Sequence, residues 1–92
     1  MFPIGRTVQT AGINNKCQND PMFALNIQNA FRRYLNKDWG DLCDDDKKMN
    51  DEALETGDQI LASYNIPQSA EKIYIITEYD RSVTTVLFAN EY

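Results

Sequence analysis

The chain has 92 residues, 42% of them hydrophobic and 25% charged, which is typical of a single folded domain (1–92) and argues against a disordered protein. No apolar run approaches the ~20 residues that cross a bilayer, and the N-terminus lacks the pattern of a secretory signal, so we expect a cytoplasmic protein without membrane contact. The net charge of −5 disfavours direct nucleic-acid binding, and the absence of histidine removes the commonest general base and the commonest nitrogen ligand of zinc.

The first predicted element is a short strand in residues 5–12, GRTVQTAG, where β-branched residues lie between glycines. The polar segment that follows, INNKCQN, is expected to be a turn. It contains Cys17, which like Cys43 shows no CxxC spacing. Both cysteines are expected to be reduced and unreactive thiols, because the chain has no histidine to activate them.

An amphipathic helix is predicted for residues 21–35. Asp20 is a typical N-cap residue, and Pro21 suits the first helical position. Apolar residues recur at helical spacing, which places them on one face that we expect to be buried. The residues on this face are Phe23, Ile27, Ala30, Phe31 and Tyr34. Basic residues follow at the C-terminal end, where positive charge is favourable to the helix dipole.

A second helix is predicted for residues 44–57, DDDKKMNDEALETG, after a break in which Gly40 is the turn residue. Acidic residues fill its first turn and Gly57 lies just past its end, as at many helix termini. Met49 and Ala53 give it a narrow apolar stripe. We therefore expect a short helix that is mostly exposed.

Three strands are predicted in the remainder of the chain, at residues 59–65, 72–78 and 82–88. Because neighbouring segments of a chain usually pair, the simplest packing is an antiparallel meander covered by the helix at 21–35. The predicted fold class is α+β: a short N-terminal strand, two helices, and a three-strand antiparallel meander packed on the first helix.

Charge is distributed unevenly. Residues 1–37 carry five basic side chains against one acid, whereas residues 38–58 carry nine acids against two lysines. Consecutive aspartates on a helix fan out by ~100° and do not converge on one ion, so we expect no metal and no cofactor. The acids favour a helix start, and they also form a candidate surface for a basic partner. The candidate partner-binding acids are Asp38, Asp41, Asp44, Asp45, Glu52 and Glu55.

Trp39 is the only tryptophan and lies in the sequence DWGD. One interpretation is a plug between helix and sheet, with Gly40 allowing a tight turn beneath the ring. The other is an exposed partner contact, because tryptophan is favoured at the centre of interfaces. The sequence leaves both interpretations open.

A second polar cluster lies between the last two predicted strands. Its candidate partner-binding residues are Glu78, Tyr79, Asp80 and Arg81. One interpretation is a turn fixed by Asp80 and Ser82, with Arg81 paired to a nearby carboxylate. Another is a pair of carboxylates in a catalytic cleft. We expect no enzyme, because no nucleophile motif or phosphate-binding loop accompanies these residues.

Two separated motifs carry a resemblance to a group of small uncharacterised bacterial proteins. The segment KDWGDLCDDDKKMNDEAL is similar to the group's GDWGDL, acids, and N-x-x-AL-x-x-G pattern. The segment IYIITEYDRSVTTVLFANEY is similar to its ending, IWIITE-x-DRS-x-TT-x-LFP-x-EY. The resemblance covers residues 35–92. In this chain Lys37 replaces a usual glycine, Tyr79 replaces an alanine, and Tyr34 lies where many members have histidine.

Members of this group occur on plasmids, integrated elements and phages. The resemblance therefore implies a non-catalytic binding protein of a mobile element, acting by protein–protein contact in the bacterial host cell. The implied partner is a host nucleic-acid-handling defence complex, with a CRISPR-associated nuclease as the first candidate (an anti-CRISPR protein). The alternative is an accessory or small-ligand-binding domain, or an enzyme that uses Glu78, Asp80 and Arg81.

Overall fold

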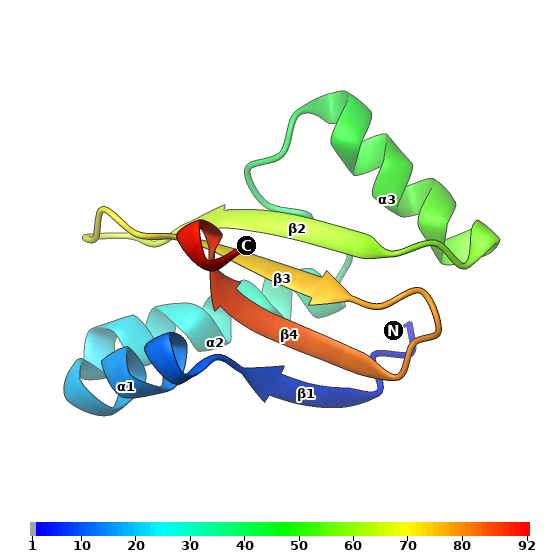
Figure 1. The fold of residues 1–92 in the computed structure, drawn as a ribbon. Coiled ribbons are helices and arrows are strands. Elements are labelled where there is room, and N and C mark those ends of the chain that lie inside the picture. The colour runs from blue at the N-terminus through cyan, green and yellow to red at the C-terminus, as the bar shows by residue number, and fades with distance from the viewer. Residues whose placement is uncertain (1) are drawn as a thin grey trace.

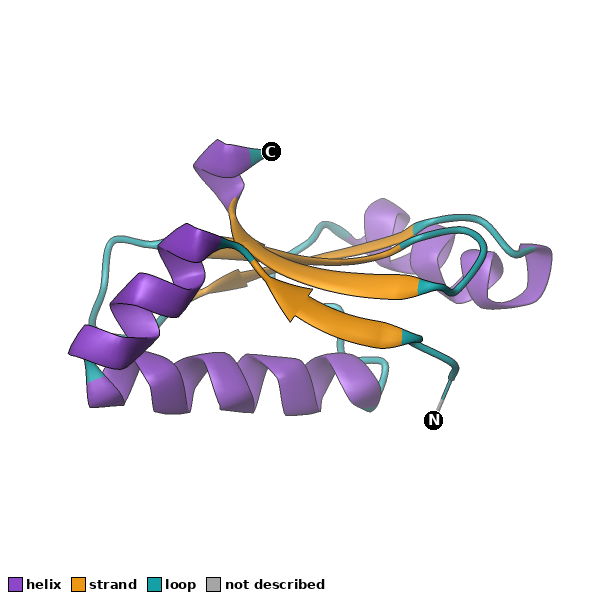
Figure 2. Ribbon diagram, turned by 60° about the horizontal axis from the view of Figure 1, so that its bottom comes forward, coloured by secondary structure: helices purple, strands orange, loops and turns teal. Residues whose placement is uncertain are grey.

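The computed structural model describes residues 2–92 as an α+β fold, which confirms the predicted class. A four-stranded sheet carries two helices on one face and a third helix beside one edge (Figures 1 and 2). The elements in chain order are β1 (Arg6–Gln9), α1 (Ala11–Asn19), α2 (Pro21–Leu35), α3 (Asp44–Thr56), β2 (Ile60–Asn65), β3 (Lys72–Thr77), β4 (Val83–Phe88) and a 3₁₀ turn, η1 (Ala89–Glu91).

The sheet has the order β1-β4-β3-β2. Strands β2, β3 and β4 form the predicted antiparallel meander. The prediction was incomplete, because β1 also joins the sheet and pairs parallel with β4, with Arg6 opposite Val83. A parallel pair needs a long crossover connection, so no local turn signal announces it. The sheet is therefore mixed and has four strands instead of three.

Helix α2 begins and ends where the sequence predicts. The Asp20 side chain accepts a hydrogen bond from the Phe23 amide at 3.1 Å, and Pro21 occupies the first turn. Its buried residues are Phe23, Ile27, Ala30 and Tyr34. Phe31 differs from the prediction, because it is only half-buried. With 15 residues α2 is the longest helix of residues 2–92, and none of the helices described there is long and apolar enough to span a membrane.

Helix α1 replaces the turn that was predicted for INNKCQN. Thr10 caps it by accepting a hydrogen bond from the Ile13 amide at 3.3 Å. Ile13 is fully buried, and Cys17, one turn later on the same face, packs against the core. The polar composition hid this short apolar stripe, which is sufficient to hold nine residues against α2 and β4.

Helix α3 confirms the second predicted helix, and Gly57 ends it with a φ of 85°. The predicted apolar stripe was partly wrong. Ala53 is buried, but Met49 is 65% exposed, and the buried position beside Ala53 belongs to the polar residue Asn50. Asn50 is buried because its side chain bonds to the backbone of the adjacent strand β2.

Three buried hydroxyl groups link α2 to the sheet. The Tyr34 and Thr77 oxygens lie 2.6 Å apart, and the Thr77 and Thr84 oxygens lie 2.7 Å apart. Thr84 donates to the carbonyl of Ile4 at 2.7 Å. Each hydroxyl has one proton, and Thr84 gives its proton to Ile4. Thr77 therefore donates to Thr84, and Tyr34 donates to Thr77. Burial raises the pKa of Tyr34 to about 12, so the phenol keeps the proton that it donates.

The unequal burial of two phenylalanines on α2 gives a test of the fold. Phe23→Ala should lower the free energy of unfolding by ~3–5 kcal/mol, the usual cost of removing a buried aromatic ring. Phe31→Ala should cost about half as much or less, because less apolar area leaves water at that position. Urea denaturation of the two variants measures the difference. Equal losses for both variants would contradict the described packing of α2.

Candidate functional site

The DWGD segment runs beside the outer edge of β2. Gly40 forms a parallel bridge with Ser63. The Asp41 amide donates to the Ser63 carbonyl at 2.7 Å, and the Ser63 amide donates to the Trp39 carbonyl at 3.4 Å. Gly40 has a φ of 77°, and a Cβ atom on it would lie 2.0 Å from the Ser63 oxygen. Only glycine fits this approach, because other residues disfavour the positive φ and add a clashing atom.

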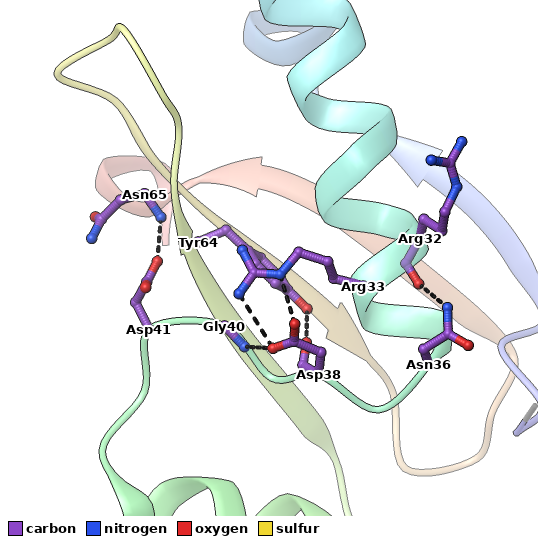
Figure 3. A network of polar contacts seen from close by, with 8 residues as sticks. All are labelled: Arg32, Arg33, Asn36, Asp38, Gly40, Asp41, Tyr64 and Asn65. Atoms are coloured by element: carbon purple, nitrogen blue, oxygen red, sulfur yellow. Dashed lines mark hydrogen bonds and ion pairs between the residues drawn. The ribbon is translucent and has the colours of Figure 1, made fainter.

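Side chains complete the closure of the same edge. Asn50 donates to the Leu61 carbonyl at 2.9 Å and accepts from the Leu61 amide at 3.2 Å. Asp41 accepts from the Asn65 amide at 2.7 Å (Figure 3). The outward amides of alternate residues along β2 therefore all have partners. A closed edge cannot recruit a further strand.

Trp39 has the first of the two roles that the sequence left open. Its side chain is 2% exposed, so it is not available for a contact with another protein. The indole nitrogen donates to the Asp51 carboxylate at 2.9 Å, which ties the segment to α3. The ring lies edge-on to Tyr34 and tilted against Phe2, with centroids 5.5 and 5.8 Å away. Trp39 is therefore a plug in the core between α2, α3 and the N-terminal segment.

Asp38 forms an ion pair with Arg33 at the start of the DWGD segment. The Arg33 Nε–H donates to Asp38 at 2.7 Å, and its guanidinium lies over the Tyr64 ring, 5.2 Å from the centroid (Figure 3). The Gly40 amide donates to the same carboxylate at 3.1 Å. The hydrogen bond from Arg33, and then that from Gly40, holds the pKa of Asp38 below its usual value. Asp38 therefore serves the fold, although half of its side chain remains exposed.

The turn before β4 also has internal partners. Asp80 accepts hydrogen bonds from the Ser82 hydroxyl at 2.6 Å and the Ser82 amide at 3.0 Å, which lower its pKa. The expected pairing of Arg81 with a carboxylate was wrong. Its guanidinium donates to backbone carbonyls of Ala53, at 2.8 Å, and Asp58, at 2.8 Å. Arg81 therefore ties this turn to the C-terminal end of α3.

Glu78 and Tyr79 have fewer contacts in the same turn. Glu78 is half-buried and accepts a weak hydrogen bond from Gln59 at 3.4 Å. Tyr79 is 69% exposed. Asp80 and Arg81 form hydrogen bonds that hold the turn. Of the carboxylate pair considered for a catalytic cleft, only Glu78 has no such role in the turn. Of the four predicted contacts in this turn, Tyr79 and Asp80 are exposed, and the side chain of Tyr79 is the one without an internal hydrogen bond among residues 2–92.

Four of the predicted acids lie together on the outer side of α3. At about 100° per residue, Asp44, Asp45, Glu52 and Glu55 fall within about 100° of arc. All four are exposed, and we call them the acidic face. Lys48 lies within the same arc and is also exposed. Adjacent aspartates diverge on a helix, as expected from the sequence, but Glu52 and Glu55 return to the side of Asp44 and Asp45 two to three turns later, with Lys48 between the two pairs.

A hollow of about 380 Å³ lies next to the acidic face, between α3 and β2. Its apolar lining includes Leu42, Met49 and Leu61, and its acidic lining includes Asp46, Glu52 and Asp58. No lysine or arginine contributes to this lining. The hollow could not be predicted from the sequence, because it depends on how α3 packs against β2. The available signal was Met49, an apolar residue in a segment of mostly charged residues.

The described part of the chain contains no group of residues that could hold a metal ion. Among residues 2–92, no three Asp, Glu or Cys side chains gather closely enough to hold an ion. The cysteines are both free thiols, with Cys17 half-buried and Cys43 exposed. That the protein functions without a metal or a cofactor remains a prediction.

Comparisons with protein-family models, curated proteins and solved structures gave no match. The motif positions of this chain nevertheless have clear structural roles, because Gly40, Asp41, Asn50 and Arg81 close the β2 edge or hold α3. Lys37, at the position where the resemblance leads us to expect glycine, has a φ of 64°. The exposed positions of these segments are therefore better candidates for binding than the positions that are bonded within the fold.

Two glycines with positive φ provide a matched test of the β2 edge. Gly57→Ala should cost about 1 kcal/mol, because the new Cβ meets no atom within 4 Å and only the backbone is strained. Gly40→Ala should cost several times more, because the Cβ also collides with Ser63. Thermal and urea unfolding would measure both losses. Similar losses would mean that the close approach of Gly40 to Ser63 is not tight.

The Asp38 ion pair predicts a pH dependence of stability. A lowered folded pKa stabilises the protein above the ordinary carboxyl value of about 3.9 and loses this effect as pH falls through the folded pKa. Asp38→Asn, which keeps an acceptor for Gly40, should be less stable than the native protein at pH 7 by at most ~1 kcal/mol. The gap should close below pH ~4 in urea denaturation. A gap that persists at pH ~2 would exclude this origin.

Proposed function

We propose that this protein is a small non-catalytic binding protein that contacts a basic surface of a partner protein through the acidic face and the adjoining hollow. The partner class is a host nucleic-acid-handling defence complex, and the origin is a mobile element acting in the bacterial cytoplasm. A CRISPR-associated effector is the first partner to test. The origin and the partner's biological role rest on the motif resemblance, whereas the binding surface rests on charge and exposure.

The single observation that carries the proposal is the absence of internal partners for the acidic charges. Among residues 2–92, the only side-chain ion pair within 4 Å joins Arg33 and Asp38. The four carboxylates of the acidic face therefore have no ion-pair partner within 4 Å among residues 2–92. Such a concentration of like charge is unfavourable in the free protein and is relieved when a basic surface binds.

The hollow adds chemical detail to the partner. Met49, Leu42 and Leu61 offer apolar contact, and three carboxylates surround it. A lysine or arginine side chain matches both properties, because its aliphatic stem packs on apolar groups while its charge meets the acids. Proteins that handle nucleic acids present such side chains in rows along the groove that binds phosphates. The acidic face would occupy that groove and exclude the nucleic acid.

Neutralisation of the acidic face tests the proposal. The quadruple variant Asp44→Asn, Asp45→Asn, Glu52→Gln and Glu55→Gln should remain folded, because these exposed charges contribute little to stability. Its affinity for a purified CRISPR effector should fall by roughly tenfold or more, since each lost contact is worth ~0.2–1 kcal/mol. Calorimetry over a range of salt concentrations should give a shallower salt dependence for the variant.

Lys48 supplies a matched control in the middle of the same face. Lys48→Gln removes an opposing charge, so it should strengthen binding to a basic partner while leaving the fold unchanged. Equal affinities of the native protein, the quadruple variant and Lys48→Gln at low salt would overturn the proposed surface. Another basic nucleic-acid-handling protein could instead bind Lys48→Gln most tightly, the native protein less tightly and the quadruple variant least tightly. That result would support the proposed surface and replace the proposed partner.

A further inference from the structure

The sheet has a second edge, formed by β1, which is open. The Arg6 amide donates to the carbonyl of Ser82, just before β4, at 3.0 Å. The Thr10 amide donates to the carbonyl of Val86, within β4, at 3.1 Å. Because backbone groups alternate along a strand, the amides of Thr7 and Gln9 point to the opposite side. No strand of residues 2–92 lies on that side, and both residues are exposed.

Helix α2 lies on one face of the sheet, near this open edge (Figure 2). A groove of about 420 Å³ runs between α2 and the edge, lined by Ile27, Phe31 and Leu35 from the helix and by Thr7 from β1. Phe31 is half-buried in this groove, and among residues 2–92 no strand lies beyond β1. One additional strand beside β1 would cover this part of α2. The groove and the unpaired backbone groups of β1 therefore lie at the same edge of the sheet.

The charge around this edge is opposite to that of α3. Arg32 is the only charged residue among those lining the groove, and Arg6 is exposed on β1 itself. No acidic side chain contributes to the lining. This edge therefore favours an acidic ligand.

We propose that the β1 edge binds an extended acidic segment of another protein, which adds to the sheet as a fifth strand. Alternate residues of the segment would be apolar and would enter the groove over Phe31 and Leu35. The residues between them would face the other side of the sheet, where Arg6 lies by strand alternation, and would carry Asp or Glu there. Main-chain hydrogen bonds to Thr7 and Gln9 would supply affinity, as in other cases of strand addition.

A second copy of the chain fits this edge less well than an acidic segment. Two β1 strands meeting edge to edge would bring another Arg6 and another Arg32 to the same seam, and like charges across such a seam are unfavourable. Pairing of β1 with β2 of another copy is excluded by the bonded outer edge of β2. The acidic surface of α3 is helical and cannot add as a strand.

A displayed library of random short peptides tests the site and requires no purified partner protein. Recovered peptides should alternate Val, Ile, Leu or Phe with Asp or Glu. Addition of a synthetic recovered peptide should shift the NMR amide signals of Thr7 and Gln9 and slow their hydrogen exchange. Two N-methylated forms of the peptide provide a further test, one methylated at the odd-numbered amides and one at the even-numbered amides. One form should lose binding and the other should bind unchanged, because only one of the two sets of amides faces β1.

Charge reversal at opposite edges provides the matched variants. Arg6→Glu should weaken the recovered peptide about fivefold or more, whereas Lys48→Glu on α3 should leave its affinity within about twofold. Thr7→Pro removes one outward amide without removing a β1–β4 hydrogen bond, and it should also weaken binding.

Several outcomes would overturn the inference. These are a library that yields no enriched peptides, enriched peptides without apolar–acidic alternation, or amide shifts that map to α3. Protection of the Thr7 and Gln9 amides in a concentration-dependent dimer, without any peptide, would assign the edge to a second copy instead.

Discussion

The backbone of Gly40 lies against the carbonyl of Ser63 at a distance that no side chain permits. This contact turns the chain from α2 along the edge of β2. It places Trp39 in the core and Asp41 opposite Asn65, and it sets where α3 can begin. The acidic residues of α3 are consequently displayed away from the sheet. A local steric constraint therefore determines both the closed edge and the position of the charged surface.

The two edges of the sheet differ in chemistry as well as in pairing. The β2 edge is bonded by a neighbouring segment and flanked by an acidic helix. The β1 edge has free backbone groups and basic neighbours, Arg6 and Arg32. An exposed edge invites unwanted pairing, and positive charge along it is one way in which proteins limit that risk. The same charge makes the edge selective for acidic segments.

Local rules predicted the elements whose signals are local. Asp20, Pro21 and Gly57 mark helix ends through their own backbone chemistry, and the apolar strands of the meander follow one another in the chain. The parallel pairing of β1 could not be predicted, because its partner is remote in sequence. The sequence also did not indicate that Asn50 and Arg81 would bond to backbone groups of other elements. Those contacts exist only after α3 has docked, so residue type and spacing do not encode them visibly.

The parallel pairing of β1 with β4 also bears on how the chain folds. Arg6 pairs with Val83, so nearly the whole sequence must be closed into a loop before this contact forms. Helices and the β2–β3 hairpin can form earlier from neighbouring residues, whereas β1 has to wait for β4. On the ribosome, α2 would therefore remain partly uncovered until residues 83–88 have emerged. During synthesis this interval is when the chain is most open to chaperones and to aggregation.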